Sequence, residues 1–326
     1  MVVALGHPCS AQKRSKVSDQ LHLFSQPEQT VSCAADSPLT TESARLALGR
    51  WPGLYLGTSS WTFPGWSELV YGGEYSKTVL ADRGLRAYSN LGFFRTVSLD
   101  RTYYRPMSEQ GYFHLASQVP QGFKFVVKAP RELLRPTTRG FDLAAFSREF
   151  LTPLSGGLGD KLGVILIQFP PGTAADYGRP FLGYLSRFLK GLPRSLTFSL
   201  EVRDEELLDS DLSEAMKGAP VSLCGSIHSS LPSPDQQLLK VPPTPEIPLV
   251  FRWNIRPSMA YEDAKGRFEP FREIQMEDIK RRELLVRLVK RALKAGRSVY
   301  VTANNKAEGC APLTLLRFLE GLDEEL

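Results

Sequence analysis

Four ionisable side chains stand at or just after short apolar runs of the sequence, where strands would end. They are Asp100, Lys128, Glu201 and Arg203. A carboxylate such as Glu201, helped by Asp100, can act as a general base or as a ligand for Mg²⁺ or Mn²⁺. Lys128 and Arg203 can hold a phosphate and stabilise the charge that develops on it. These residue types predict a catalytic site for phosphoester chemistry.

Other polar and aromatic side chains follow neighbouring apolar runs and are candidates for holding a ligand. They are Ser59, Trp61, Tyr104, Gln168, Arg252, Asn304 and Asn305. Aromatic rings in such places can stack on a base or a sugar, but more often they pack loops over a core. The charged members have a structural alternative, because Lys–Glu or Arg–Glu pairs can close the core of a barrel. The whole set favours a ligand site, since burying so many polar groups only to cap a core is costly.

The last part of the chain offers a place for an anion. The run Asn304-Asn305-Lys306 precedes Pro312, which stands where a helix would begin. Proline suits the first helical position, and the free backbone N–H groups of a helix start attract anions. The sequence therefore predicts a phosphate site here, with an ordinary capped helix start as the alternative.

Familiar cofactor motifs are absent from the sequence. It contains no G-x-G-x-x-G after a strand, no G-x-x-x-x-G-K-[ST] and no G-x-S-x-G, so no nucleotide cofactor is predicted. Two of the four histidines lie near the N-terminus, which excludes a histidine-rich metal centre. A carboxylate site for Mg²⁺ or Mn²⁺ on Asp100, Glu201 and His228 is left open, and any other cofactor is unknown.

The elements that must position these residues are short apolar runs that alternate with stretches of helical periodicity. The expected strands are residues 54–58, 95–99, 124–128, 162–169, 196–202, 221–226, 249–253 and 298–303. The expected helices are residues 77–91, 109–118, 143–154, 179–192, 205–217, 273–295 and 312–322. This alternation predicts parallel strands joined by right-handed crossovers. Eight units with near-continuous apolar strands favour a closed TIM-type (β/α)8 barrel over a doubly wound open sheet.

Two long connections interrupt the alternation, and both follow a strand. Residues 225–248 hold six prolines, which exclude a long helix, and residues 254–272 carry basic and aromatic side chains. In a TIM barrel the loops that follow strands form the face where ligands bind. Both connections are therefore expected to be lids or binding loops.

Residues 1–50 differ in composition from the rest of the chain. They are rich in Ser, Gln, Thr and Ala and show little periodic apolar signal. We expect a flexible tail over residues 1–50, with a short helix at 41–48, and the barrel over residues 51–326.

A short motif in this tail resembles the peptide with which bacterial replication and repair proteins dock on the sliding DNA clamp. Gln20, Leu21, Leu23 and Phe24 form the pattern Q-L-x-L-F. Leu23 and Phe24 can fill an apolar pocket, Leu21 packs beside them, and the Gln20 amide can hydrogen-bond. The expected partner is a bacterial sliding clamp, and a chance apolar patch is the alternative.

The chain of 326 residues has a formal net charge of +5 and a pI of about 9.0. This mild basic excess suits an anionic partner, such as nucleic acid or a phosphorylated small molecule, without requiring one. No apolar run approaches the roughly 20 residues that span a bilayer, and no signal peptide is recognised. Four scattered cysteines suggest reduced thiols. The sequence predicts a cytoplasmic protein without a membrane partner.

Several short motifs are characteristic when taken together. They are Gly57-Thr58-Ser59-Ser60-Trp61, Thr102-Tyr103-Tyr104-Arg105, Lys128-Ala129-Pro130-Arg131, Gln168-Phe169-Pro170-Pro171, Glu201-Val202-Arg203, Arg252 and Asn304-Asn305. From about residue 55 to residue 321 the chain resembles the YecE-like family, domain of unknown function 72. The resemblance implies a TIM-type barrel and no established reaction. The family usually has glutamate where Ser98 stands and histidine where Asp204 and Asn254 stand, so acid–base chemistry through those positions would differ here.

The leading functional hypothesis is a phosphate-recognising hydrolase that acts on nucleic acid or a nucleotide and is linked to DNA maintenance through its tail. The alternative is a non-enzymatic binding protein, or an enzyme that acts on a small phosphorylated or sugar metabolite. A broad basic rim would favour the first hypothesis, and a deep pocket would favour the second.

Overall fold

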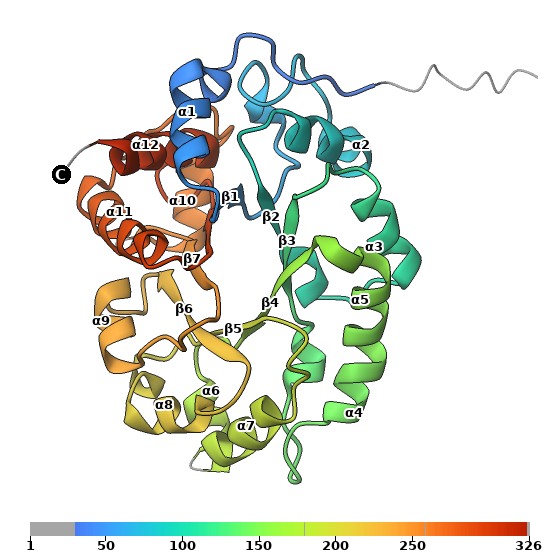
Figure 1. Ribbon diagram of the computed structural model, residues 1–326, viewed down its shortest axis with the longest axis vertical. Helices are drawn as coiled ribbons and strands as arrows, with labels where there is room; N and C mark the ends of the chain where they lie inside the picture. Colours follow the sequence, from blue (N-terminus) through green and yellow to red (C-terminus); the bar gives the residue numbers. More distant parts are fainter. Residues whose placement is uncertain (1–29, 179, 258, 325–326) are drawn as a thin grey trace, which may run out of the picture. The chain divides into compact units, whose positions relative to one another are not determined.

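The computed structural model describes residues 30–178, 180–257 and 259–324, which form a closed barrel of eight parallel strands surrounded by helices (Figure 1). The strands follow one another around the barrel in chain order, and β8 closes it by pairing with β1. Their bounds are β1 Leu54–Thr58, β2 Thr96–Leu99, β3 Lys124–Lys128, β4 Leu162–Gln168, β5 Phe198–Glu201, β6 Val221–Ile227, β7 Leu249–Trp253 and β8 Val299–Ala303. The predicted TIM-type barrel is confirmed.

The strands enclose an apolar cluster that is separate from the larger core between the strands and the helices. It consists of Val126, Val164, Leu166, Cys224, Val250 and Tyr300. Side chains alternate along a strand, so residues two positions further on face the same way. The Lys128 side chain therefore points into the barrel interior, as that of Val126 does, and the Arg252 side chain points there as that of Val250 does. The polar strand ends thus point into the C-terminal mouth of the barrel.

Helices cover the outside of the barrel and pack apolar faces against it (Figure 1). Their bounds are α1 Glu42–Arg50, α2 Lys77–Asn90, α3 Glu109–Ala116, α4 Leu143–Phe146, α5 Thr152–Leu158, α6 Thr173–Tyr177, α7 Pro180–Lys190, α8 Ser210–Met216, α9 Pro234–Lys240, α10 Tyr261–Phe268, α11 Ile279–Lys294 and α12 Ala311–Asp323. The helix expected at 143–154 is divided by a π-helical turn at Ser147–Leu151. Among the helices of the described residues, none combines the length and apolar character needed to cross a bilayer.

Residues 31–50 pack with the barrel, although their composition suggested a tail. The expected short helix is present as α1, which buries Ala44, Ala47 and Leu48. It lies beside α12 (Figure 1), and Arg50 forms an ion pair with Asp323 at 2.5 Å. A short helix that packs on one face needs only a few apolar residues, so its average composition stays polar. The clamp-like motif at residues 20–24 lies outside the described residues.

Each long connection contains a short helix that the sequence pattern did not reveal. α9, in the connection from β6 to β7, is seven residues long and begins at a proline, so the expected absence of a long helix there is correct. α10 lies in the connection from β7 to α11. Ile255, Ala264, Phe268 and Phe271 of this connection form an apolar cluster of their own. This cluster gives the loop a fixed shape beside the mouth.

Candidate functional site at the barrel mouth

Glu201 ends β5 and is fully buried, with both carboxylate oxygens occupied. Oε1 accepts hydrogen bonds from Nη2 of Arg203 at 2.6 Å and from the Ser226 hydroxyl at 2.8 Å. Oε2 accepts from Nη1 of Arg252 at 2.7 Å. The donors follow β5 or lie on β6 and β7, whose C-terminal ends meet at this point. Glu201 therefore ties three neighbouring strands together.

Arg252 also holds a second carboxylate, that of Asp100. Its Nη2 atom lies 2.7 Å from Oδ2 of Asp100, and the Ser98 hydroxyl donates to Oδ1 at 2.6 Å. Asp100 begins a 3-10 turn after β2, and its side chain is 31% exposed, whereas that of Glu201 is 0% exposed. Asp100 is thus the carboxylate that a ligand in the mouth can reach.

The two arginines keep Glu201 ionised. Burial by itself raises the pKa of Glu201, but the guanidinium groups of Arg203 and Arg252 outweigh burial and hold that pKa well below its usual range. Burial also opposes the charge of Arg252, but Asp100 and Glu201 raise the pKa of Arg252 above its usual value. A carboxylate stabilised in this way is a poor proton acceptor. The geometry therefore gives Glu201 the role of positioning Arg203 and Arg252.

The carboxylates considered for Mg²⁺ or Mn²⁺ do not fit a metal. The Arg252 guanidinium bridges Asp100 and Glu201, so a positive charge already lies between them. Within the part of the chain that the structure describes, no three or more His, Cys, Asp and Glu side chains are grouped to hold an ion. Asp100 and Glu201 form ion pairs with the arginines of this site instead.

Lys128 ends β3 and lies in the mouth without a salt bridge to any described carboxylate. Its Nζ atom is 3.8 Å from the centroid of the Tyr103 ring. Burial lowers the pKa of Lys128 to about 8, and the attraction of Asp100 opposes this only in part. A sizeable fraction of this amine is therefore neutral at pH 7 to 8.

His228 follows β6 and presents a neutral imidazole to the mouth. Nδ1 of His228 is engaged with Ser230, whose hydroxyl oxygen lies 2.9 Å from it and whose backbone nitrogen lies 3.3 Å from it. Burial, helped by the positive charge of Arg203, lowers the pKa of His228 to about 4. Because Ser230 occupies Nδ1, Nε2 is the ring nitrogen with which neutral His228 can hydrogen-bond a ligand in the cavity.

A cavity of about 670 Å³ opens above these residues, and its lining is strongly cationic. Two carboxylates, Asp100 and Glu269, line it together with seven basic side chains, namely Lys77, Arg101, Lys128, Arg203, Arg252, Lys265 and Lys306. The Arg101 guanidinium lies 5.4 Å from the Trp61 ring centroid, and Nζ of Lys306 lies 4.1 Å from that of Tyr261. A cavity of this volume suits a small molecule, and its charge suits an anion.

Most of the ligand-binding residues predicted from the sequence line this cavity. They are Ser59, Trp61, Tyr104, Arg252 and Asn304. The Asn304 amide donates to the Ser59 hydroxyl at 2.9 Å, which joins the ends of β8 and β1. Trp61 is buried, and its indole N–H donates to the Leu80 carbonyl at 2.9 Å, so it forms a fixed wall. Tyr104 is exposed at the rim.

Gln168 and Asn305 lie elsewhere. Gln168 lines a neighbouring cavity of about 350 Å³ together with Tyr103 and Arg131. Asn305 is buried, and its side-chain oxygen accepts from the Ala311 backbone N–H at 2.8 Å. The first residues of α12 are likewise buried and do not line the mouth cavity. The start of α12 is thus an ordinary capped helix start, and the phosphate site expected there is not accessible.

Asp204 and Asn254 stand where the resembling family usually has histidine, and both side chains contact other groups of the protein. Both oxygens of Asp204 accept from backbone N–H groups at the start of α6, those of Gly172 at 2.7 Å and Ala174 at 2.9 Å. Asp204 therefore fixes a loop and does not face the mouth. The Asn254 amide donates to the Ser226 hydroxyl at 2.9 Å and lines the cavity.

Several basic residues of the lining are not among the site residues predicted from the sequence, although Lys306 belongs to the run Asn304-Asn305-Lys306 considered for an anion. Lys77 comes from the start of α2, Arg101 from the turn after β2, Lys265 from α10 and Lys306 from the segment after β8. The basic and aromatic composition of residues 254–272 was a valid signal for Lys265 and Tyr261. Composition alone could not show which of these side chains turn toward the cavity.

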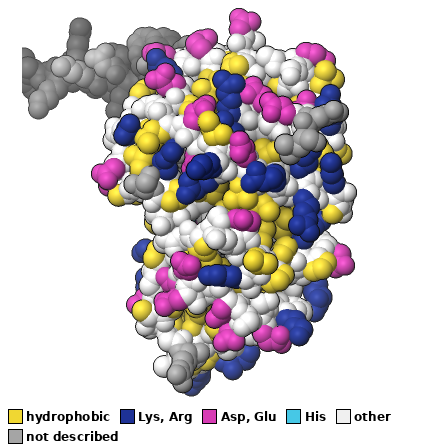
Figure 2. All heavy atoms as spheres, turned by 90° about the vertical axis from the view of Figure 1, so that its left-hand side faces the viewer, with side chains coloured by type: hydrophobic (Ala, Val, Ile, Leu, Met, Phe, Trp, Pro, Cys, Tyr) yellow, Lys and Arg dark blue, Asp and Glu magenta, His cyan; other side chains and the backbone are white. Residues whose placement is uncertain are grey.

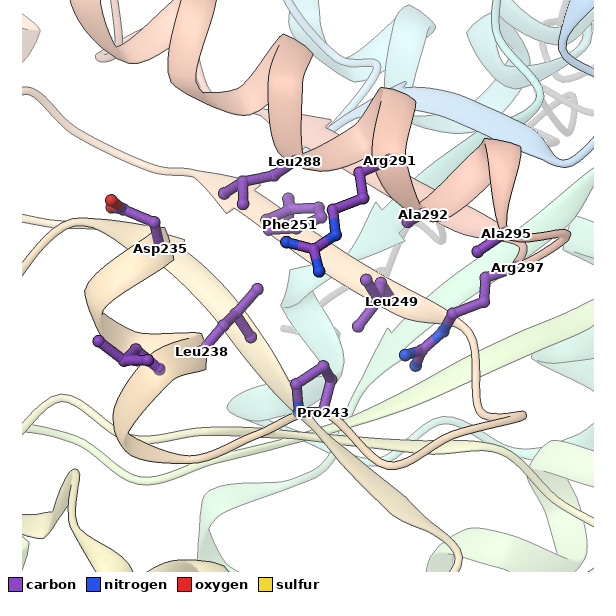
Figure 3. Close-up of a pocket in the computed structure, with 11 residues that line it drawn as sticks. Asp235, Leu238, Pro243, Leu249, Phe251, Leu288, Arg291, Ala292, Ala295 and Arg297 are labelled. Carbon is purple, nitrogen blue, oxygen red and sulfur yellow. The ribbon is translucent and has the colours of Figure 1, made fainter.

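A second hollow of about 450 Å³ lies outside the barrel, between α9 and α11 (Figure 3). Leu238, Phe251 and Leu288 line it, with Arg291 and Arg297 beside them. On the face that carries α11, Lys and Arg side chains are mixed with Asp and Glu, and apolar surface lies between them (Figure 2). This hollow lacks the network of carboxylates and arginines found in the mouth, so we place the chemistry in the mouth.

The fold is a (β/α)8 barrel, and a cavity with a largely basic lining opens at its mouth. Residues 55–326 match the family described as "Protein of unknown function DUF72", and the chain belongs to that family. A DUF72 protein of Enterococcus faecalis V583 is 19% identical, with a TM-score of 0.58 and coverage of 84% of this chain and 96% of that chain. A DUF72 protein of Thermotoga maritima MSB8 is 22% identical, with a TM-score of 0.58 and coverage of 83% and 99%. These likenesses show the fold alone. No curated protein matches the chain.

Proposed function

We propose that the mouth of the barrel binds a small phosphorylated molecule, a sugar phosphate or a nucleotide, and that the chain is an enzyme acting on it. The observation that carries this proposal is the lining of the mouth cavity, where seven basic side chains accompany two carboxylates. A cavity with such a charge excess lowers the free energy of a bound phosphate and excludes cationic ligands.

The roles of individual residues follow from their exposure and partners. Arg101, Lys265 and Lys306 stand at the wall and hold the phosphate group. Nε2 of His228 hydrogen-bonds to the ligand, and Arg203 stabilises negative charge that develops on a ligand oxygen. Asp100, held by Arg252 and Ser98, accepts a hydrogen bond from a water molecule or a ligand hydroxyl and so orients it for phosphoester hydrolysis. Glu201 acts indirectly by positioning the two arginines.

Nucleic acid is a second candidate substrate, favoured by the clamp-like motif at residues 20–24. In this version, the tail brings the barrel to DNA by docking on a sliding clamp, and the cationic mouth accepts a phosphate of a strand end. The cavity volume favours the small molecule, because a duplex needs a broad basic surface rather than a pocket of 670 Å³.

Ligand-dependent thermal stabilisation tests the proposal. The protein is heated with phosphate, pyrophosphate, sugar phosphates, nucleotides, oligonucleotides, Mg²⁺ or Mn²⁺, and matched uncharged sugars serve as controls. A true ligand at about one hundred times its Kd adds about 2.7 kcal/mol to the unfolding free energy. We expect a rise in Tm with phosphorylated small molecules and none with uncharged sugars. A Tm that no phosphorylated compound raises above that of the free protein would contradict the proposal.

Salt dependence separates the two candidate substrates. Nucleic-acid binding that releases many counterions weakens by about a thousandfold or more between 50 and 200 mM salt. Binding of a sugar phosphate through one phosphate group should weaken far less over that range. A steep loss with an oligonucleotide, together with no response to sugar phosphates, would favour nucleic acid.

A further inference from the structure

Lys128 differs from the other basic groups deep in the mouth because it lacks a carboxylate partner in the described structure. Four charged groups surround it: Asp100, Glu201, Arg203 and Arg252. Both carboxylates are already engaged with the guanidinium groups of Arg203 and Arg252 at 2.6 to 2.7 Å. The Nζ atom of Lys128 instead faces the Tyr103 ring at 3.8 Å and lines the open cavity.

These surroundings favour the neutral amine. Burial removes water from the ammonium group, and Arg252 and Arg203 add positive charge beside it. Asp100 and Glu201 oppose both effects, but the pKa of Lys128 still falls to about 8. A lysine at that pKa carries a neutral, nucleophilic fraction at pH 7 that is roughly two hundred times larger than that of an ordinary lysine.

We propose that Lys128 is a covalent nucleophile that forms an imine with the carbonyl group of a small phosphorylated aldehyde or ketone. This inference rests on the proposed function, since the phosphate group would be held by Arg101 and Lys306 at the wall of the same cavity. It narrows the substrate class to carbonyl compounds and gives Lys128 a role other than holding phosphate.

The step balances without a metal or a redox partner. The lone pair of the neutral Nζ attacks the carbonyl carbon, and one amine proton moves to the carbonyl oxygen. A proton from solvent then joins that oxygen, which leaves as water while the C=N bond forms. The product is a positively charged imine on Lys128. Arg203 lines the same cavity, and its guanidinium group is suited to stabilise the carbonyl oxygen as negative charge grows on it.

Reductive trapping tests the inference on the full-length protein. The protein is incubated with glyceraldehyde 3-phosphate and sodium cyanoborohydride, digested, and mapped by mass spectrometry. We expect label on Lys128 at least ten times faster than on any other lysine, with a rate that rises with pH around a midpoint of about 8. Uniform labelling of surface lysines, or none on Lys128, would overturn the inference.

Two variants control for the position of the amine. Lys128→Arg should lose the fast label, whereas Lys124→Arg should keep it. Lys124 is a matched control because it begins the same strand, β3, and donates to the Asp160 carbonyl away from the mouth. Should Lys128→Arg fail to fold, the map of the wild-type protein still decides, because fragment masses locate the label directly.

A second comparison separates this inference from the proposed function. Glyceraldehyde without phosphate is trapped in parallel, with inorganic phosphate as a competitor. Fast labelling of Lys128 by both aldehydes at equal rates would support the nucleophile and contradict phosphate recognition. Stabilisation by sugar phosphates without any label on Lys128 would support phosphate recognition and overturn the nucleophile. Faster labelling by the phosphorylated aldehyde, slowed by inorganic phosphate, supports both.

Discussion

Arg252 and Asp100 are 152 residues apart in the chain, and Nη2 of the arginine lies 2.7 Å from Oδ2 of the aspartate. The pair spans the mouth from β7 to the turn after β2. The other guanidinium nitrogen, Nη1, holds Glu201 at 2.7 Å. One buried cation therefore fixes two carboxylates, of which Glu201 is closed off and Asp100 faces the cavity. This arrangement separates the group that stabilises the site from the group that meets a ligand.

We predict that Glu201→Gln destabilises the protein by about 3–5 kcal/mol. The amide is neutral, so Arg203 would lose its ion pair with a carboxylate and Arg252 would keep only that with Asp100, while both stay buried. Urea denaturation followed by circular dichroism measures the loss. Ser226→Ala removes one neutral donor to the same carboxylate and should cost about 1 kcal/mol, which makes it a matched control.

The loss of unfolding free energy caused by Glu201→Gln should depend on pH. The pKa of Glu201 is depressed in the folded state, so its contribution to stability is present above the ordinary carboxyl pKa and is lost as pH falls toward the folded value. The difference in unfolding free energy between wild type and Glu201→Gln should therefore shrink below pH 4. A variant as stable as wild type at pH 7 would contradict the assignment of Glu201 as the residue that holds the arginines.

Strand positions were predicted well because each strand has a local signal. β1, β3 and β7 have the bounds that their apolar runs suggested, and the others differ by one or two residues at one end or, for β5, at both ends. Three short helices, α6, α9 and α10, were missed because prolines and polar residues obscure their periodicity. The residues of α1 were assigned to a tail for a similar reason, since a short helix that packs on one face stays polar on average.

The different positions of the two carboxylates, with Glu201 buried against arginines and Asp100 facing the cavity, could not be predicted from the sequence. The sequence places Glu201 and Asp100 at strand ends but does not show which one is closed off by arginines. That depends on the Arg252 side chain, which lies on a strand far along the chain from both. The same limit applies to Asn305, whose position after β8 suggests a ligand group although its side chain caps α12. The role of each of these side chains depends on hydrogen-bond partners that only the closed barrel brings next to it.

We predict that His228 gives the folded state a distinct acid sensitivity. Burial, helped by Arg203, lowers the pKa of His228 from its ordinary value to about 4 in the folded protein. As pH falls from 6.5 to 4, the unfolded chain takes up a proton that the folded chain resists, so stability is lost in that window. His228→Asn should lack this loss, a difference of about 1 kcal/mol for a partly exposed group. Urea denaturation at pH 7 and pH 5 measures it, and equal pH slopes for both proteins would contradict it.

We predict that Arg101→Ala and Lys306→Ala each weaken binding of a phosphorylated ligand about tenfold, because each removes one charge-assisted hydrogen bond. Both side chains line the mouth cavity. Isothermal titration with a ligand identified by thermal stabilisation measures the affinity. Arg187→Ala is the matched control, since Arg187 also lies over an aromatic ring, that of Tyr184 at 5.2 Å, on a helix that does not line the mouth. Equal losses in all three variants would show that the effect is general charge and not the site.

The last prediction concerns the Q-L-x-L-F motif of Gln20, Leu21, Leu23 and Phe24. A synthetic peptide of residues 17–28 should bind a bacterial sliding clamp in a fluorescence polarisation assay without the barrel. Replacing Leu23 and Phe24 together with Ala should abolish binding, because each buried side chain contributes about 1.5–3 kcal/mol. Replacing His22 with Ala should leave binding unchanged, since it occupies the variable position of the motif.

Deleting residues 2–29 of the full chain should remove clamp binding, whereas deletion through residue 45 should also lower Tm, because Val31, Leu39 and Ala44 are buried in the core. No binding of the peptide at high micromolar concentration would leave the motif as a chance pattern and remove the support for a nucleic-acid substrate.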